Sequence, residues 1–165
     1  MSENKPAKTT PGDNHSAFWY ERDPNLLEGE KIAMANFFPS FKLEKLENGQ
    51  LCWIGTLNPN GIAGGIWTVM ALYENNHPNN SIYGGSIKIY PIRPNLNELR
   101  IALEKLPHVL HDNINYWYIA TTCSYEVNII TSAASHLLQA SKWIFLFEGW
   151  LDGSISEEKF FGHKF

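Results

Sequence analysis

Apolar residues recur at helical spacing near the start of the chain, in residues 23–38. Asp23 has the side chain of a helix N-cap, and Pro24 suits the first helical position because its missing amide hydrogen is not needed there. Pro39 is expected to end this helix. The apolar positions that predict its buried face are Leu27, Ile32, Ala35 and Phe38.

Apolar and polar residues then alternate, which is typical of strands. Residues 41–57 predict a strand, a tight turn at Asn48 and Gly49, and a second strand. After a loop of turn residues, residues 65–76 predict a third strand. A fourth strand is predicted over residues 83–94.

Prolines interrupt this alternation. Pro91 and Pro94 are expected to end the fourth strand, because proline cannot donate a hydrogen bond to a neighbouring strand. Residues 95–106 then predict a short helix from their apolar spacing. Residues 108–123 show no regular period and are predicted to be irregular.

A long apolar pattern at helical spacing returns near the C-terminus. Thr131 or Ser132 can cap this helix, and Gly153 is a natural stop. The order of helix, antiparallel four-stranded meander, irregular segment and helix predicts an α+β fold with helices on one sheet. The apolar positions of the last helix are Ala133, Leu137, Ala140, Ile144, Phe147 and Leu151.

Composition limits the class of protein. A chain of 165 residues, 44% hydrophobic and 18% charged, is expected to form one domain over residues 17–165 after a polar, flexible tail over residues 1–16. A formal charge of −4 offers no basic surface for nucleic acid. No apolar run approaches the roughly 20 residues of a membrane span, and no secretory signal is expected because residues 1–7 have no apolar stretch or cleavage-site pattern. These features favour a cytoplasmic protein that binds neither nucleic acid nor membranes.

The chain has two cysteines, which a reducing cytoplasm would keep as free thiols. Cys52 lies inside a strand pattern and is expected in the core. Cys123 follows His111, Asp112 and Asn113 at a short distance along the chain. Free cysteines are most often buried, so composition alone does not make Cys123 a nucleophile.

The order and spacing of these motifs resemble the ubiquitin-conjugating enzyme (UBC-like) family over residues 23–153. FKLEKLENGQLCWIGTLNP resembles its first hairpin, with an Asn-Gly turn and Trp-x-Gly-x-Leu, and IWTVMALYENNHPNN resembles its third-strand segment with a His-Pro turn. HDNIN resembles the His-Pro-Asn motif that precedes the acyl-carrying thiol. The resemblance implies a UBC-like fold with an N-terminal helix, an antiparallel four-stranded meander, an active-site segment and a C-terminal helix.

Three further stretches resemble a bacterial branch of this family, the stand-alone conjugating enzymes of short type II CBASS anti-phage operons. These are YGGSIKIYPIRP, PHVLHDN and SAASHLLQASKWIFLFEGWLDG. There the enzyme accompanies a cGAS-like nucleotidyltransferase. The resemblance implies that this nucleotidyltransferase is the partner. The enzyme would act on its C-terminal glycine in the way that a conjugating enzyme acts on the C-terminal glycine of a ubiquitin-like protein.

The resemblance also implies roles for individual residues. Cys123 is the candidate nucleophile, since a thioester carrier needs a thiolate. Asn113 is the candidate donor to the carbonyl oxygen or the organiser of its loop, and His111 would hold the segment by hydrogen bonds. Asp112 or Glu126 could take the proton of an incoming amine.

An activated donor is needed as well. The stretch GIAGG lacks the Lys-Ser/Thr of a phosphate-binding loop, so the chain is not expected to adenylate a carboxylate itself. The donor would come from a separate activating enzyme, or from a thioester or peptide bond formed without ATP.

Departures from the family pattern keep other hypotheses open. Asp112 replaces the proline of the motif, the spacing from His111 to Cys123 is slightly long, and no leucine follows the cysteine. A second hypothesis is therefore a catalytically inactive UBC-like module that binds the same partner, and a third is an unrelated interaction domain with a buried Cys123. His108, His111 and Cys123 could also contribute to a zinc site, but no fourth ligand completes a tetrahedron, so no metal or cofactor is expected.

The C-terminal stretch KFFGHKF is unusually aromatic for a polar tail. Phe160, Phe161 and Phe165 are expected either to pack back on the domain or to dock on a partner.

Overall fold

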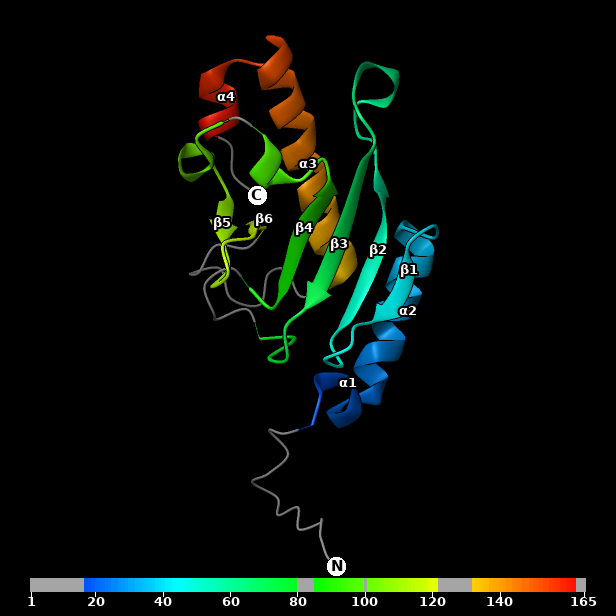
Figure 1. Ribbon diagram of the computed structural model, residues 1–165. Helices are drawn as coiled ribbons and strands as arrows, with labels where there is room; N and C mark the ends of the chain where they lie inside the picture. The colour runs from blue at the N-terminus through cyan, green and yellow to red at the C-terminus, as the bar shows by residue number, and fades with distance from the viewer. Residues whose placement is uncertain (1–16, 80–84, 100, 122–131, 163–165) are drawn as a thin grey trace, which may run out of the picture.

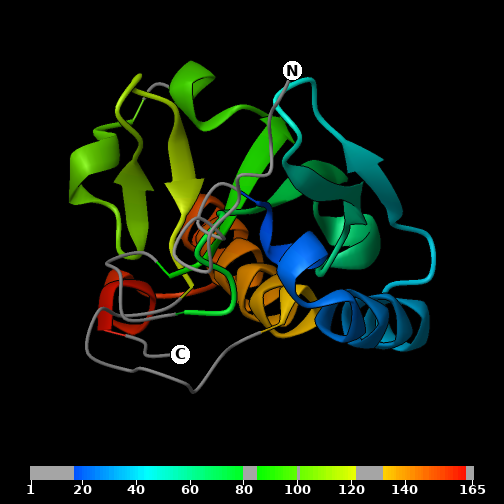
Figure 2. The ribbon, with the colours of Figure 1, turned by 90° about the horizontal axis from the view of Figure 1, so that it is seen from below.

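The protein has an α+β fold in which one antiparallel sheet carries helices on one of its faces (Figure 1, Figure 2). The α+β class predicted from the sequence is thereby confirmed. Cys123 and Glu126 lie outside the residues that the computed structural model describes, and so does the tail predicted over residues 1–16. The described residues are 17–79, 85–99, 101–121 and 132–162.

The sheet has six strands in the order β1-β2-β3-β4-β6-β5. The first four form the predicted antiparallel meander, with its first turn at Asn48 and Gly49. A short hairpin, β5 and β6, extends the sheet beside β4. The strands are β1 (Lys42–Lys45), β2 (Leu51–Leu57), β3 (Trp67–Tyr73), β4 (Ile87–Arg93), β5 (Val109–His111) and β6 (Trp117–Ile119).

Local signals place the ends of the two long helices as predicted. The Asp23 side chain accepts a hydrogen bond from the Leu26 amide at 3.1 Å, and the Ser132 side chain accepts one from the Ser135 amide at 3.1 Å. Gly153 ends the last long helix with φ of 86°, a conformation that favours glycine. The helices are α1 (Trp19–Arg22), α2 (Pro24–Phe37), α3 (Ala133–Asp152) and α4 (Glu157–Gly162).

The sheet has a buried face and an open face. α2 and α3 lie on the same side of it, so alternate strand residues point into the core (Figure 2). The opposite face has no described helix over it and carries apolar side chains of its own. Core-facing positions are Trp53, Val69, Ala71, Tyr73, Ile87 and Ile89, and open-face positions include Ile54, Met70, Leu72 and Tyr90.

A buried carboxylate joins α2 to the start of α3. Glu30 Oε1 accepts hydrogen bonds from the Tyr73 hydroxyl at 2.5 Å and from the Ala133 amide at 2.9 Å. Glu30 Oε2 lies 3.8 Å from Nε2 of the buried His77. Burial raises the pKa of Glu30, although its hydrogen bonds act in the opposite direction. This residue therefore holds the first turn of α3, which follows the segment that contains Cys123.

The buried face predicted for α2 is partly wrong. Ile32 is 63% exposed and Ala35 is exposed, whereas Glu30 and Met34 are the buried residues of this helix. The prediction from apolar spacing treats every charged residue as exposed, so it cannot identify a buried face that contains a glutamate. The hydrogen bonds from Tyr73 and Ala133 are what make that burial tolerable.

The region after the third strand needs three corrections. Pro91 does not end the fourth strand, because it lies beside a register shift and β6 pairs with β4 only at Ile89. The helix predicted over residues 95–106 is replaced by two 3-10 turns, Leu96–Glu98 and Leu103–Lys105, whose leucines reach the core. The segment 108–123, predicted to be irregular, contains β5 and β6.

The aromatic C-terminal stretch packs back on the domain in its described part. Phe160 on α4 is fully buried and stacks on Trp150 at 5.2 Å between ring centroids. Phe161 also contacts Trp150 but stays 38% exposed. Phe165 lies outside the described residues. One of the two alternatives for this stretch is thus confirmed for Phe160.

Candidate active site

The β5–β6 hairpin positions the His-Asp-Asn motif. His111 is the last residue of β5, and Asp112 and Asn113 begin the turn that leads to β6. The Asp112 amide donates to the Tyr116 carbonyl at 2.9 Å, and Asn115 takes a φ of 69° within this turn. Asparagine is among the few residues that adopt this conformation readily, so the sequence favours a tight turn here.

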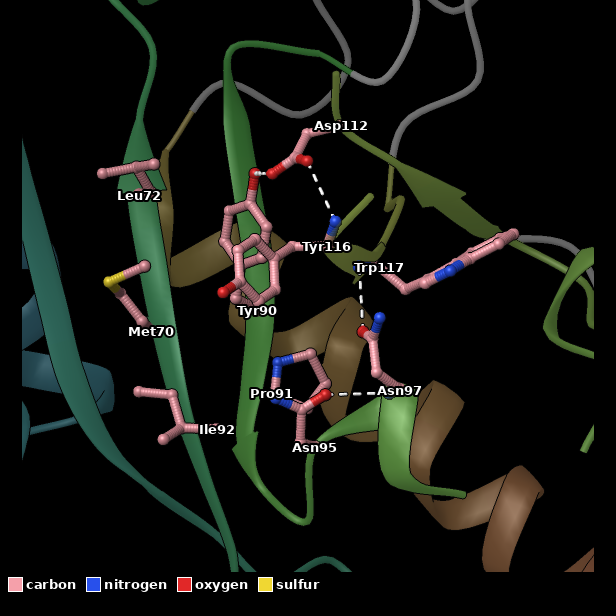
Figure 3. Close-up of a pocket in the computed structure, with 10 residues that line it drawn as sticks. All are labelled: Met70, Leu72, Tyr90, Pro91, Ile92, Asn95, Asn97, Asp112, Tyr116 and Trp117. Carbon is pink, nitrogen blue, oxygen red and sulfur yellow. Dashed lines mark hydrogen bonds between the residues drawn. The ribbon is translucent and has the colours of Figure 1, made fainter. Parts of the chain in front are cut away.

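The Asp112 carboxylate is the centre of that turn. Its Oδ1 accepts hydrogen bonds from the amides of Ile114 at 2.9 Å and Tyr116 at 3.0 Å. Its Oδ2 accepts one from the hydroxyl of Tyr90 on β4 at 3.0 Å (Figure 3). Desolvation alone would raise the pKa of Asp112, but the two amides, Tyr90 and the charge of Lys88 together lower it.

These contacts give Asp112 a structural function that the sequence argument did not foresee. It ties the hairpin turn to the central sheet through Tyr90. A lowered pKa also makes a carboxylate a weaker base, so the contacts favour turn formation over proton removal. The assignment of Asp112 as a base for an incoming amine stays a prediction.

His111 is exposed and oriented by two contacts. Its Nδ1 lies 2.9 Å from the carbonyl oxygen of Asp112, and its ring lies against that of Trp117, opposite it on β6, at 5.0 Å. A carbonyl oxygen only accepts, so Nδ1 must carry the proton of this hydrogen bond. In the neutral ring this leaves Nε2 as an acceptor. This arrangement agrees with a histidine that holds its segment by hydrogen bonds.

Asn113 is exposed at the tip of the same turn. Its side chain makes no hydrogen bond to the other described residues. An amide in this state can donate to a bound carbonyl oxygen without breaking an internal contact. His111, Asp112 and Asn113 therefore lie at the start of one hydrogen-bonded turn.

The distance from this turn to the candidate nucleophile is not defined, because Cys123 lies in residues 122–131, outside the described part of the chain. Glu126, the other candidate base, lies there too. The described residues bracket this segment: Ala120 and Thr121 are buried after β6, and α3 begins at Ala133.

The other cysteine is in an unreactive environment. Cys52 on β2 is fully buried, and its Cα partners are Leu72 and Glu44 on the neighbouring strands. Burial, with the charge of Glu44, raises its pKa to about 11. Only about one part in ten thousand of such a thiol is ionised at neutral pH. Of the two cysteines, Cys52 can therefore be set aside as a nucleophile.

A cavity of about 330 Å³ lies next to the turn, on the open face of the sheet (Figure 3). It forms where β4 and β6 are no longer paired, since these two strands pair only at Ile89 and Ile119. Asn97 bridges this opening, because its Oδ1 accepts from the Trp117 amide at 3.4 Å and its Nδ2 donates to the Asn115 carbonyl at 3.0 Å. The lining residues are Met70, Leu72, Tyr90, Pro91, Ile92, Asn95, Asn97, Asp112, Tyr116 and Trp117.

Sequence reasoning missed the residues that support the motif, namely Tyr90, Asn97 and Tyr116. A usable signal existed for two of them. The run Asp-Asn-Ile-Asn is rich in turn residues and is followed directly by Tyr116, which predicts a hairpin turn rather than an irregular segment. Tyr90 alternates with the buried Ile89, which places its side chain on the opposite face of the sheet. Asn97 has no comparable local signal.

The chain was compared with protein-family models, curated proteins and solved structures, and none of them matches it. Among the described residues, no helix is long and apolar enough to cross a membrane. The same residues contain no group of three or more His, Cys, Asp or Glu side chains arranged to hold a metal ion. The site must therefore be interpreted from its own geometry.

Proposed function

We propose that this protein is a ubiquitin-conjugating-type acyl transferase with a UBC-like arrangement, in which Cys123 carries an acyl group as a thioester. One observation carries the proposal. The turn upstream of Cys123 holds His111 by hydrogen bonding, and the exposed Asn113 side chain makes no hydrogen bond to the other described residues. A helix, an antiparallel meander, this turn and a long helix follow one another along the chain in the order that the resemblance implies.

The proposed reaction has two acyl transfers. The Cys123 thiolate attacks the carbonyl carbon of an activated C-terminal glycine, and the bond from that carbon to the activating group breaks. The leaving group takes the electron pair and the glycine becomes a thioester. An amine, or another acceptor, then attacks the thioester carbonyl, loses a proton to a base, and releases the Cys123 thiolate. Asn113 stabilises the oxyanion in both steps.

The donor we propose is the C-terminus of a cGAS-like nucleotidyltransferase or of a ubiquitin-like protein, in bacterial anti-phage defence and in the cytoplasm. A separate activating enzyme supplies the activated glycine where the donor is not already a thioester. The support for the donor is the resemblance of YGGSIKIYPIRP, PHVLHDN and the α3 sequence to the CBASS branch.

The test is intact-mass analysis after co-expression with the neighbouring operon proteins, with and without a reducing agent. Wild type is compared with Cys123→Ala, and Cys52→Ala is the matched control because Cys52 is buried and un-ionised at neutral pH. A thiol-labile adduct that is lost in Cys123→Ala and kept in Cys52→Ala supports the acyl carrier, and its mass identifies the donor. If a stable complex forms without any adduct, the chain is a catalytically inactive binding module instead.

A further inference from the structure

We infer that the cavity beside the Asp112 turn accepts one large apolar side chain, of leucine or phenylalanine size, from the extended peptide tail of the acyl donor. This inference rests on the proposed function, since it places a donor tail at the turn. It adds a specificity site on the open face of the sheet, with a substrate preference that can be measured.

The composition of the cavity favours an apolar occupant. Met70 and Leu72 on β3 and Ile92 on β4 supply aliphatic surface, and the rings of Tyr90 and Tyr116 add aromatic walls (Figure 3). Its volume of about 330 Å³ is at the lower end of the roughly 300–1,000 Å³ of small-molecule sites. This volume is ample for one side chain of leucine or phenylalanine size.

The polar groups of the cavity are largely used within the protein. The Tyr90 hydroxyl donates to Oδ2 of Asp112, and Oδ1 of Asp112 accepts from two amides of the turn. The Asn97 amide bonds to Asn115 and Trp117. A polar small molecule would find few groups to orient it. A side chain delivered by a peptide that is already held at the reaction centre needs only apolar contact.

The apolar surface lies beside the turn that carries Asn113. Asp112 lines the cavity and is bonded along the chain to Asn113, the proposed oxyanion donor. Ile92 and Tyr116 line the cavity while 43% and 53% exposed, and Ile114, in the same turn, is 66% exposed. Exposed apolar side chains gathered at one site are typical of a binding surface. A peptide whose terminal carbonyl lies at Asn113 can place its preceding residues along this surface.

Methionine NMR can test this directly, because the chain has methionines only at positions 1, 34 and 70. The protein carries ¹³C-methyl methionine and the Cys123→Ala substitution, so binding is measured without chemistry. The probes are acetylated Gly/Ser peptides that end in glycine, with one leucine at successive positions upstream, and the same series with asparagine. The buried Met34 is the internal control.

We expect the Met70 methyl signal to shift with leucine peptides and not with asparagine peptides, while Met34 stays unchanged. Ile92→Asp should weaken leucine-peptide binding by about tenfold or more, because it places a charge beside the occupant. Ile32→Asp is the matched control on an exposed α2 isoleucine and should leave binding unchanged. The leucine position with the largest shift gives the register of the tail.

Each of the following peptide-binding results would overturn the inference: no Met70 shift with any peptide, equal shifts with leucine and asparagine, or unchanged binding in Ile92→Asp. A Met70 shift that depends on protein concentration alone would assign the cavity to a second copy of the chain and also overturn it. Failure of the proposed function is a separate outcome, since a leucine-dependent shift can be present while wild type forms no thioester at Cys123. Thioester formation at equal rates from leucine and asparagine donors contradicts the cavity inference alone.

Discussion

Two carboxylates in this molecule have similar partners and opposite electrostatic behaviour. Glu30 and Asp112 each accept a hydrogen bond from a tyrosine hydroxyl and from at least one backbone amide. Burial raises the pKa of Glu30 despite these bonds. Asp112 is close to the surface, so desolvation is outweighed and its pKa is lowered. Asp112 also has one more hydrogen bond than Glu30 and the charge of Lys88 nearby, so burial and the number of favourable partners together set the direction of each shift.

The two carboxylates also hold different parts of the fold. Glu30 joins α2 and β3 to the first residue of α3. Asp112 joins the tip of the β5–β6 hairpin to β4. The first contact is in the core and the second is at the proposed reaction centre, on either side of the segment that contains Cys123. Both therefore help to fix where that segment starts and ends.

The largest effect is expected at the buried carboxylate. Glu30→Ala leaves the Tyr73 hydroxyl and the Ala133 amide without their acceptor in the core, which should lower the free energy of unfolding by about 3 kcal/mol. Urea denaturation followed by circular dichroism measures this change. Glu28→Ala on the same helix is the control. Glu28 is an exposed residue paired with Lys31, and its loss should change stability by less than about 0.5 kcal/mol. Equal effects of the two substitutions would contradict the role given to Glu30.

A smaller effect is expected at the turn. Asp112→Ala removes the acceptor of two amides and of the Tyr90 hydroxyl, but water can reach most of these groups. We expect a loss of about 1–2 kcal/mol in the free energy of unfolding. Asn113→Ala is the matched control, one residue along the turn, and should leave stability unchanged while slowing acyl transfer to Cys123. If Asn113→Ala destabilised the fold as much as Asp112→Ala, Asn113 would be a structural residue.

The same contrast explains what the sequence could predict. Asp23, Ser132 and Gly153 act on their own helix ends, and their effects were predicted correctly because neighbouring residues decide them. The burial of Glu30 depends on Tyr73 and Ala133, which are distant in sequence. No local period can indicate such a position.

The candidate site shows the same division. The motif of His111, Asp112 and Asn113 was found from sequence, and its residues do lie together on one turn. The hairpin that carries it was missed because β5 and β6 have only three residues each and join the sheet through one pair with β4. The cavity was also missed, since it depends on where two strands separate in space.

The smallest expected effect, and the sharpest test of the comparison, is in the pH dependence of stability. Glu30 has a raised pKa in the fold, so its contribution is complete below its ordinary value of 4.5 and is lost as pH rises through the folded pKa. Asp112 has a lowered pKa, so its contribution is present above 3.8 and is lost as pH falls through the folded pKa.

Glu30→Gln and Asp112→Asn should therefore change stability with opposite slopes. Relative to wild type, Glu30→Gln should gain stability as pH rises above 4.5. Asp112→Asn should lose stability as pH rises toward 3.8, by less than about 1 kcal/mol because this carboxylate is near solvent. The free energy of unfolding is measured by urea denaturation at a series of pH values.

Two buried histidines add a background that all variants share. Burial lowers the pKa of His77 to about 3 and that of His136 to about 4, so every variant becomes less stable as pH falls below 6.5. The His136 contribution cancels in the difference from wild type. His77 lies 3.8 Å from Glu30, so the Glu30→Gln difference below pH 6.5 also contains the change in the His77 contribution. Slopes of the same sign would mean that burial does not separate these two carboxylates.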